Sequence, residues 1–368
     1  MNDADDPVRV VGGAARADDD PVGRNAMTQE TVAAQAGHTD DADPVLADRV
    51  RAALGTPDAG PLRVLEGGRS GLTYVLHDGG SGHVVKAVPP GRPARGRHDV
   101  LRQSHVLSAL AGYGLPVPAV TAREEEVPAW FAMELAAGEA VEPVLDVGTE
   151  LHTDLARERM VRAARVLGAL HAVPLDHLAD GVRAAGGVLP EPATPHDELL
   201  RWEETMHAVP AELRPGSAEL LQALHSDVPA AVAPVLVHGD FRLGNLLCSG
   251  VEPTALVDWE IWGVGDPRID LGWFGVFTDG TLFPGVGRVV AGLPSEDELG
   301  ELYRGAGGTQ PHTAWFRALA RMKMAAIMGH NLRRHREGRH HDPVQEQLPP
   351  TIAALIDSGR ALLGGGAS

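Results

Sequence analysis

The stretch His238-Gly-Asp-Phe-Arg-Leu-Gly-Asn245 decides the fold, and Leu256-Val-Asp-Trp-Glu260 follows it shortly afterwards. Together they supply an aspartate, an amide five residues later and a second aspartate inside an apolar run. A carboxylate can accept a proton from a hydroxyl, while carboxylate and amide oxygens suit Mg²⁺ as hard ligands. We interpret the stretches as a phosphoryl-transfer site, with Asp240 as the base and Asn245 and Asp258 as metal ligands.

Each part of this constellation has a simpler explanation. An aspartate followed by an asparagine arises often by chance, and a carboxylate after an apolar run can simply cap a turn. His238 is interpreted as a hydrogen-bonded structural histidine in either case. We expect Asp258 to be buried among apolar neighbours, which would be costly unless it bound a cation. The co-occurrence of the parts is what favours a functional site.

A lysine far upstream strengthens this interpretation. Lys86 lies in the alternating run 84–88, after a glycine-rich turn at 66–71. The glycines of such a turn, with Ser70 and Gly71, let backbone amides approach a phosphate. A lysine flanked by apolar residues is most often a solvent-facing residue of an edge strand. Its place after this turn favours phosphate binding over that alternative.

Composition excludes several classes of protein. The net charge of −18 argues against a general nucleic-acid-binding surface, although residues 1–44 contribute ten acidic residues against three arginines. The single cysteine, Cys248, rules out a disulfide framework or a cysteine zinc site within one chain. No apolar run approaches the ~20 residues of a membrane span, and the acidic N-terminus does not resemble a secretory signal. We therefore expect a cytoplasmic protein without a membrane or nucleic-acid partner.

The chain divides into three predicted parts. Residues 1–44 have no helical or strand period and are predicted to be a disordered acidic tail, with Met27 as an alternative start. Residues 45–137 predict a small strand-rich lobe, and residues 138–368 a mainly helical one. The predicted helices cover 45–55, 97–112, a stretch from about 150 to 171, two stretches within 195–226, 312–337 and 350–363. The predicted strands cover 62–65, 72–76, 83–88 and 130–135.

The motifs carry a resemblance to a known family. Residues 238–247, 257–260 and 265–273, with weaker matches at 114–118 and 133–138, resemble the aminoglycoside phosphotransferase and choline kinase branch of the protein-kinase-like fold. The similarity covers roughly residues 50–360. It extends in particular to the phosphotransferase domains found alone or fused to acyl-CoA dehydrogenases. The expected fold is α+β and two-lobed, with a small antiparallel sheet in the N-lobe and a mainly helical C-lobe.

The resemblance also implies ligands and roles. ATP would lie between the lobes with its adenine against Met133, Glu134 and Leu135, and Lys86 would hold the phosphates. Asp240 would be the catalytic aspartate, and Asn245 with Asp258 would bind Mg²⁺.

Several neighbouring residues have less certain roles under the resemblance. Arg242 would contact the γ-phosphate or an acidic substrate, or else form a surface salt bridge. Glu260 is expected to reach Mg²⁺ through water. Asp266 and Asp270 are expected to brace the loop.

One position departs from the family pattern. The helix after Lys86 commonly carries a glutamate that pairs with the lysine, and the counterpart here is Gln103. A glutamine can hydrogen-bond the ammonium but cannot neutralise it. Glu134, another acid or ATP itself would then supply the counter-charge.

A late polar segment, 328–341, has three interpretations. A metal site is disfavoured because His330 and His335 are five residues apart, and His340 and His341 are adjacent. A basic helix end that holds an anionic substrate is a second interpretation. A solvated helix terminus with cations at its C-terminal end is the default.

The sequence thus predicts an ATP- and Mg²⁺-dependent kinase that phosphorylates a hydroxyl group of a small molecule. A hydroxyacyl-CoA or a related metabolite is the narrower hypothesis for the acceptor. An aminoglycoside or another antibiotic is the first alternative, and a nucleotide-binding pseudokinase with a regulatory role is the second. The sequence does not set the oligomeric state.

Overall fold

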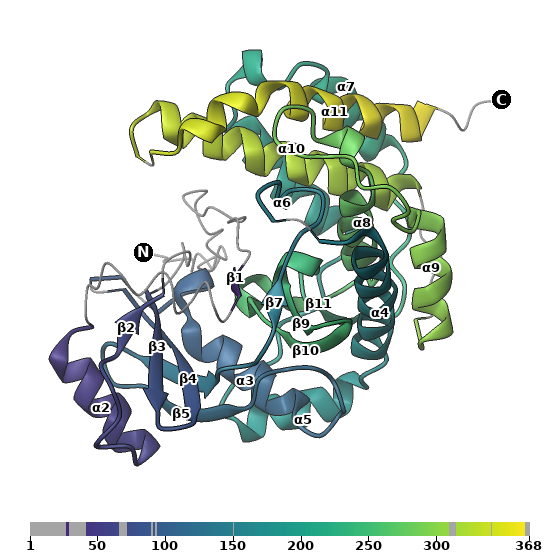
Figure 1. The fold of residues 1–368 in the computed structure, drawn as a ribbon. Helices are drawn as coiled ribbons and strands as arrows, with labels where there is room; N and C mark the ends of the chain where they lie inside the picture. Colours follow the sequence, from purple (N-terminus) through teal and green to yellow (C-terminus); the bar gives the residue numbers. More distant parts are fainter. Residues whose placement is uncertain are drawn as a thin grey trace, which may run out of the picture.

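The computed structural model describes residues 27–28, 42–65, 72–89, 91–92, 94–149, 151–308, 314–339 and 341–364. A smaller strand-rich part lies at one end of the molecule and a larger helical part at the other (Figure 1). This arrangement confirms the predicted α+β class. Most of the predicted acidic tail and the glycine-rich turn with Ser70 and Gly71 lie outside the described residues.

The smaller part is built on a five-stranded antiparallel sheet in the order β2-β3-β4-β6-β5. Helix α2 packs on it, burying Leu46 and Val50 with Val85 and Trp130 of the sheet. Because β4 is paired on both sides, Lys86 is not on an edge strand, and that alternative was wrong. The bounds are α2 Pro44–Leu54, β2 Arg63–Val64, β3 Leu72–Asp78, β4 Ser81–Ala87, β5 Val120–Glu124 and β6 Trp130–Glu134.

Helix α3 (Val100–Leu110) connects the sheet to the helical part. Its apolar face belongs to one buried cluster with Phe131 of β6, Met160 of α4 (Thr153–His171) and Leu178 of α5 (Leu175–Ala184). A short 3₁₀ turn, Gly96–His98, precedes it, and the Asp99 carboxylate caps its N-terminus. The helix therefore begins three residues later than the predicted 97–112.

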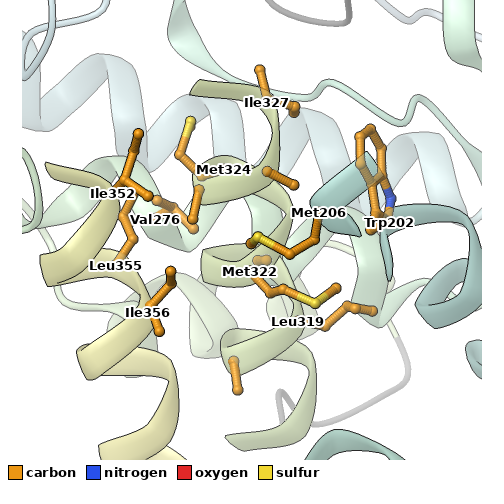
Figure 2. Close-up of a cluster of buried hydrophobic side chains, with 14 of the residues drawn as sticks. Trp202, Met206, Val276, Leu319, Met322, Met324, Ile327, Ile352, Leu355 and Ile356 are labelled. Atoms are coloured by element: carbon orange, nitrogen blue, oxygen red, sulfur yellow. The ribbon is translucent and has the colours of Figure 1, made fainter. Parts of the chain in front are cut away.

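Helix α10 (Ala314–Arg336) is the centre of the helical part. Figure 2 shows it between α11 (Pro349–Gly364), which contributes Ile352, Leu355 and Ile356, and α6 (Pro195–His207), which contributes Trp202 and Met206. A helix surrounded in this way is buried on most of its faces, which its run of Met and Ala residues allows. The apolar residues of α10 thus fix the helices that stand behind the motif at 238–245.

The predicted helices of this part are confirmed, whereas α5, α8 and α9 were not anticipated. The helices are α6 Pro195–His207, α7 Ser217–Ser226, α8 Arg268–Gly275, α9 Glu296–Gly305 and α11 Pro349–Gly364. Short 3₁₀ turns cover Ala211–Leu213, Leu243–Asn245, Trp259–Ile261, Val276–Thr278, Gly280–Leu282 and Pro343–Gln347.

Two small sheets carry the motif. Strand β8 (Val235–Val237) pairs with β11 (Gly263–Gly265), and a second sheet has the order β1-β7-β9-β10. Its strands are β1 Met27–Thr28, β7 Glu139–Ala140, β9 Leu246–Ser249 and β10 Glu252–Leu256.

In the parts of the chain that the structure covers, no helix has both the length and the apolarity to cross a bilayer.

Gly138 connects β6 to β7 in a conformation that requires glycine. Its φ is +118°, and a Cβ placed there would lie 2.6 Å from the Cys248 carbonyl oxygen. Gly138→Ala is therefore expected to lower the free energy of unfolding by roughly 2 kcal/mol or more. Thermal unfolding followed by circular dichroism measures this loss.

Gly148→Ala is the matched control, because nothing lies within 4 Å of a Cβ at that position. Its melting temperature should stay close to that of the wild type. Equal melting temperatures for the two variants would show that the close approach at Gly138 is not a constraint on the fold.

Candidate active site

The loop that carries Asp240 is held by a buried carboxylate on α8. Asp270 accepts the backbone N–H groups of His238, at 2.6 Å, and of Gly239, at 2.8 Å. The backbone of Gly239, at φ +85°, passes so close to Ile261 that a Cβ would lie 2.7 Å from its carbonyl oxygen. Asp270 thus braces the loop as expected.

His238 contributes to the same support. Its Nδ1 accepts from the Asp240 N–H at 3.2 Å, and its Nε2 donates to the Val257 carbonyl at 3.0 Å. Burial lowers the pKa of this imidazole, although the Asp270 and Asp240 carboxylates act in the opposite direction. The neutral ring is the form that can accept at one nitrogen and donate at the other. Its role is therefore structural, linking the loop of Asp240 to the segment before Asp258.

The Asp240 carboxylate is fixed at both oxygens. The Trp273 indole Nε1 donates to Oδ1 at 2.7 Å, and the Asn245 amide donates to Oδ2 at 2.8 Å. These bonds hold the carboxylate in one orientation, as a base must be held to meet a hydroxyl. Trp273 lies in the motif used for recognition, but the sequence did not suggest this contact.

Asn245 joins Asp240 to the segment of Asp258. Its amide nitrogen donates to both Oδ2 and the main-chain carbonyl of Asp240, at 2.8 Å each, and its own main-chain carbonyl accepts from Val257 N–H at 2.9 Å. The amide oxygen is thereby directed away from Asp240. An amide oxygen in this orientation could serve as a neutral hard ligand for a divalent cation.

Asp258 is not buried, which corrects our expectation. Its side chain is 42% exposed, although its neighbours Leu256 and Trp259 are buried. Asp258 is the one non-glycine residue with positive φ in the described part, at +66°. This left-handed turn directs the carboxylate out of the apolar run, where it could serve as a metal ligand together with Asn245.

Lys86 reaches three oxygen acceptors from β4. Its Nζ lies 3.1 Å from Gln103 Oε1 on α3, 3.4 Å from Asp258 Oδ1 and 3.5 Å from Glu260 Oε1. Although burial acts to lower the pKa of this ammonium, Asp258 and Glu260 outweigh it and raise the pKa. The counter-charge missing at Gln103 is thus supplied by these two acids.

Glu134 does not supply that charge. It stands opposite His83 in the register of β4 and β6, and its side chain is exposed. The Glu134 N–H is bonded to the Ala119 carbonyl, and the Leu135 N–H to the Gly82 carbonyl, at 2.9 Å each. An adenine at this segment would therefore have to meet carbonyl groups of residues 133–135, or backbone groups further along the chain.

Arg242 is buried, so its interpretation as a surface residue was wrong. Its Nε lies 3.6 Å from Asp240 Oδ1 and its Nη1 3.9 Å from Glu142 Oε2. Glu142 also accepts the Gly244 N–H at 3.1 Å, and burial raises the pKa of Glu142 to about 8, against the effect of Arg242. Glu142 is a site residue that the sequence did not reveal, because it lies about 100 residues upstream in a loop without a motif.

Two further expectations concern residues outside this loop. Asp266 pairs with Arg268, at 2.6 Å, rather than with the loop that carries Asp240. In the late segment, His335 accepts the Asp342 N–H at 3.0 Å and lies beside Glu346, while His340 is not described. No group of three His, Cys, Asp or Glu residues suited to a metal ion occurs in the described segments.

A cavity of about 200 Å³ opens beside Gly239. Aromatic and apolar residues line it, together with five charged ones, Arg102, Glu191, Glu198, Arg201 and Lys323. Lys323 of α10 donates to the Gly239 carbonyl at 2.5 Å and lies over the rings of Trp273 and Trp202, at 3.9 Å and 4.9 Å. This lysine was not among the residues expected from the sequence, where its only local signal is a charge inside the run 322–327.

A strand lysine paired with Asp258, and a fixed aspartate next to an amide, define a small-molecule phosphotransferase of the protein-kinase-like fold. The sequence model of the phosphotransferase enzyme family, APH, matches residues 61–308. The chain belongs to that family.

Curated relatives point to the same domain in longer proteins. The chain is 26% identical over 321 residues to acyl-CoA dehydrogenase family member 11 of Gallus gallus, which covers 82% of this chain and 40% of that protein. It is 29% identical over 230 residues to family member 10 of Mus musculus, covering 60% of this chain and 21% of that protein. The chain therefore spans less than half the length of these relatives.

Solved structures share the fold. A candidate aminoglycoside phosphotransferase from Ralstonia eutropha has a TM-score of 0.68 at 21% identity, covering 89% of this chain and 99% of that chain. Aminoglycoside 2'-phosphotransferase-IIIa in its GDP complex has a TM-score of 0.57 at 16% identity, covering 87% and 99%. At these identities the likeness establishes the fold alone.

The contacts of Lys86 predict unequal effects of two substitutions. Lys86→Met removes the cation that faces Asp258 and Glu260, so nucleotide affinity should fall about tenfold to hundredfold. Gln103→Leu removes one hydrogen bond from the ammonium to a neutral amide and leaves the two acids in place, so it should weaken binding only a few-fold. Calorimetric titration with ADP measures both. An equal loss in the two variants would mean that Gln103, rather than the acids, sets the position of Lys86.

Proposed function

We propose that the protein transfers the γ-phosphoryl group of ATP to a hydroxyl group, with Asp240 as the base. The observation that carries this proposal is one continuous set of contacts. Asp240 is bonded to Asn245, Asn245 to the backbone next to Asp258, and Asp258 to Lys86. These contacts support the proposal because they connect the residues to which we assign the roles of base, metal ligands and phosphate-binding lysine.

In this proposal, Asp240 positions the acceptor hydroxyl, and the cationic residues balance the negative charge of the phosphates. Asp240 orients the acceptor hydroxyl and accepts its proton as the new oxygen–phosphorus bond forms and the bond to the ADP oxygen breaks. Lys86 holds the phosphates, and Arg242, buried next to Asp240, adds positive charge near the transferred group. Mg²⁺, when bound by Asn245 and Asp258, would neutralise charge that develops on the phosphate oxygens.

A hydroxyacyl-CoA or a related metabolite is our narrower proposal for the acceptor. It is supported by the similarity to relatives that are named acyl-CoA dehydrogenases. The charges of the cavity support it as well, because three cations face two carboxylates. An aminoglycoside is the alternative, and such a polycation would meet a cavity with more positive than negative groups.

A pseudokinase is a weaker alternative. Its motivation was the neutral Gln103, yet Lys86 is accompanied by Asp258 and Glu260. The neutral Gln103 therefore does not leave Lys86 without a counter-charge, and the argument for a loss of activity is weakened.

Replacing the base separates chemistry from binding. Asp240→Asn should keep ADP affinity within about twofold, because the amide preserves the shape of the side chain. Turnover of any accepted alcohol should fall at least about hundredfold, since the proton acceptor is gone. Asp180→Asn, at an exposed ion pair with Arg183, is the matched control. Near-wild-type turnover of Asp240→Asn would refute its role as the base.

The chemical class of the acceptor is tested by comparing candidate alcohols from four classes. Release of ADP and mass spectrometry of the product are measured with hydroxyacyl-CoA thioesters, kanamycin, macrolides and amino alcohols. We expect the thioesters to have the highest kcat/KM. Preferred phosphorylation of kanamycin would support the aminoglycoside alternative, and ATP binding without phosphorylation of any compound would support the pseudokinase.

A further inference from the structure

Lys323 is a buried cation next to the loop of Asp240. Its side chain projects from α10 between the indole rings of Trp273 and Trp202, and it donates one hydrogen bond to the carbonyl of Gly239. Lys323 is 4% exposed and forms no ion pair among the described residues. A buried ammonium without a carboxylate partner is costly, so its presence calls for an explanation beyond packing.

The choice of lysine at this position is also unusual for the chain. Of 32 cationic residues, Lys86 and Lys323 are the two lysines, and all the others are arginines. Both lysines therefore lie in the site, one on the nucleotide side and one beside the cavity at Gly239. A compact ammonium takes up less of the cavity than a longer guanidinium would, although both carry a positive charge.

The walls of the cavity suit a short apolar chain that ends in an oxygen acceptor. The rings of Trp202 and Trp262 line it, and Arg201 of α6 lies on the same lining as Lys323. The charge of Glu198 is already engaged, since it accepts the Trp202 indole N–H at 3.0 Å and lies 3.6 Å from Arg201. Lys323 has donors left for a ligand because only one of its three is used within the described chain.

We propose that Lys323 binds the acyl oxygen of the acceptor and so selects hydroxyacyl compounds, either as free acids or as thioesters. This inference rests on the proposed transfer of a phosphoryl group to a hydroxyl at Asp240. Lys323 is bonded to Gly239, the residue before Asp240, so the recognised oxygen lies a few bonds from the reacting hydroxyl. Lys323 is thus a specificity-determining residue that holds the hydroxyl against the base.

The pH dependence of catalysis gives this role a signature. Burial lowers the pKa of Lys323 to about 8, against the effects of the Asp240, Glu198 and Asp270 carboxylates and with that of Arg201. Below that pH the ammonium is present and can bind the acyl oxygen. As the pH rises through about 8 it is lost, so kcat/KM for hydroxyacyl acceptors should fall.

The test compares Lys323→Met and Lys323→Arg with wild-type protein. The acceptors are β-hydroxybutyrate, its CoA thioester and the corresponding diol, which lacks the acyl oxygen. We expect Lys323→Met to raise KM for the acid or the thioester about tenfold or more, with little change in KM for ATP or for the diol. A preference for the acid identifies a carboxylate as the ligand, and a preference for the thioester identifies a carbonyl. Either supports the proposal.

Lys323→Arg keeps a cation at every pH used. It should recover part of the affinity for the acyl acceptors, and the fall in kcat/KM near pH 8 should disappear. An equal loss for the acid, the thioester and the diol in Lys323→Met would overturn the proposal, because it would mean that Lys323 only braces Gly239. The same conclusion would follow if the alkaline fall persisted in both variants.

Binding without turnover separates this inference from the proposed reaction. Calorimetric titration of the acid and the thioester is carried out in the presence of ADP, with Arg201→Ala as a second, less buried cationic variant. If wild-type protein phosphorylates neither compound but binds one of them, and Lys323→Met does not, then phosphoryl transfer to these acceptors is refuted while the role of Lys323 in binding stands. Absence of binding to wild-type protein refutes the role of Lys323.

Discussion

The site depends on the buried carboxylate of Asp270. Two of its bonds go to consecutive backbone N–H groups, of His238 and Gly239, and a third links it to His171 of α4. Burial alone would raise the pKa of Asp270, but the hydrogen bonds from the His171 ring and from the His238 backbone N–H lower it. One charged group therefore ties the start of the loop to α4 and α8. The orientation of Asp240 follows from this support.

The acids that balance the charge of Lys86 do not come from α3, where the family pattern places a glutamate. This affects which segments of the two parts of the molecule attract each other. Its charge is balanced by Asp258 and Glu260, both carried by the segment after β10, whereas α3 contributes the neutral Gln103. The attraction across the site thus runs between β4 and that segment. The position of α3 is set instead by apolar packing and by Arg102, which lies 4.2 Å from the centre of the Trp262 ring.

The site residues that could be predicted from the sequence are those that lie close to one another along the chain. Asp240, Asn245 and Asp258 lie within about twenty residues, and local backbone geometry brings them together. The exposure of Asp258 could not be inferred, because its apolar neighbours suggested burial while a left-handed backbone turn directs the side chain outward. For the fold, the longer helices were predicted well, including α10, which is buried on most of its faces. The missed helices α5, α8 and α9 have only 10, 8 and 10 residues, and strand β5 is interrupted by a register shift.

Residues supplied by distant segments could not be predicted. Glu142 and Lys323 come from chain about 100 residues before the loop of Asp240 and about 80 after it. Nothing in their own surroundings identifies a partner at that distance. The net charge of −18 likewise gave no indication that the cavity beside Gly239 carries more cations than carboxylates. Only tertiary packing determines which charges meet.

Trp202 belongs to two environments at once. It packs in the apolar cluster around α10, as Figure 2 shows, and its ring also forms a wall of the cavity beside Gly239. Substitutions that enlarge the cavity there would also remove core packing. By contrast, Pro190, Glu191 and Ala193 border the cavity without belonging to that cluster. Substitutions in this loop can therefore change the shape of the cavity and leave the core around α10 intact.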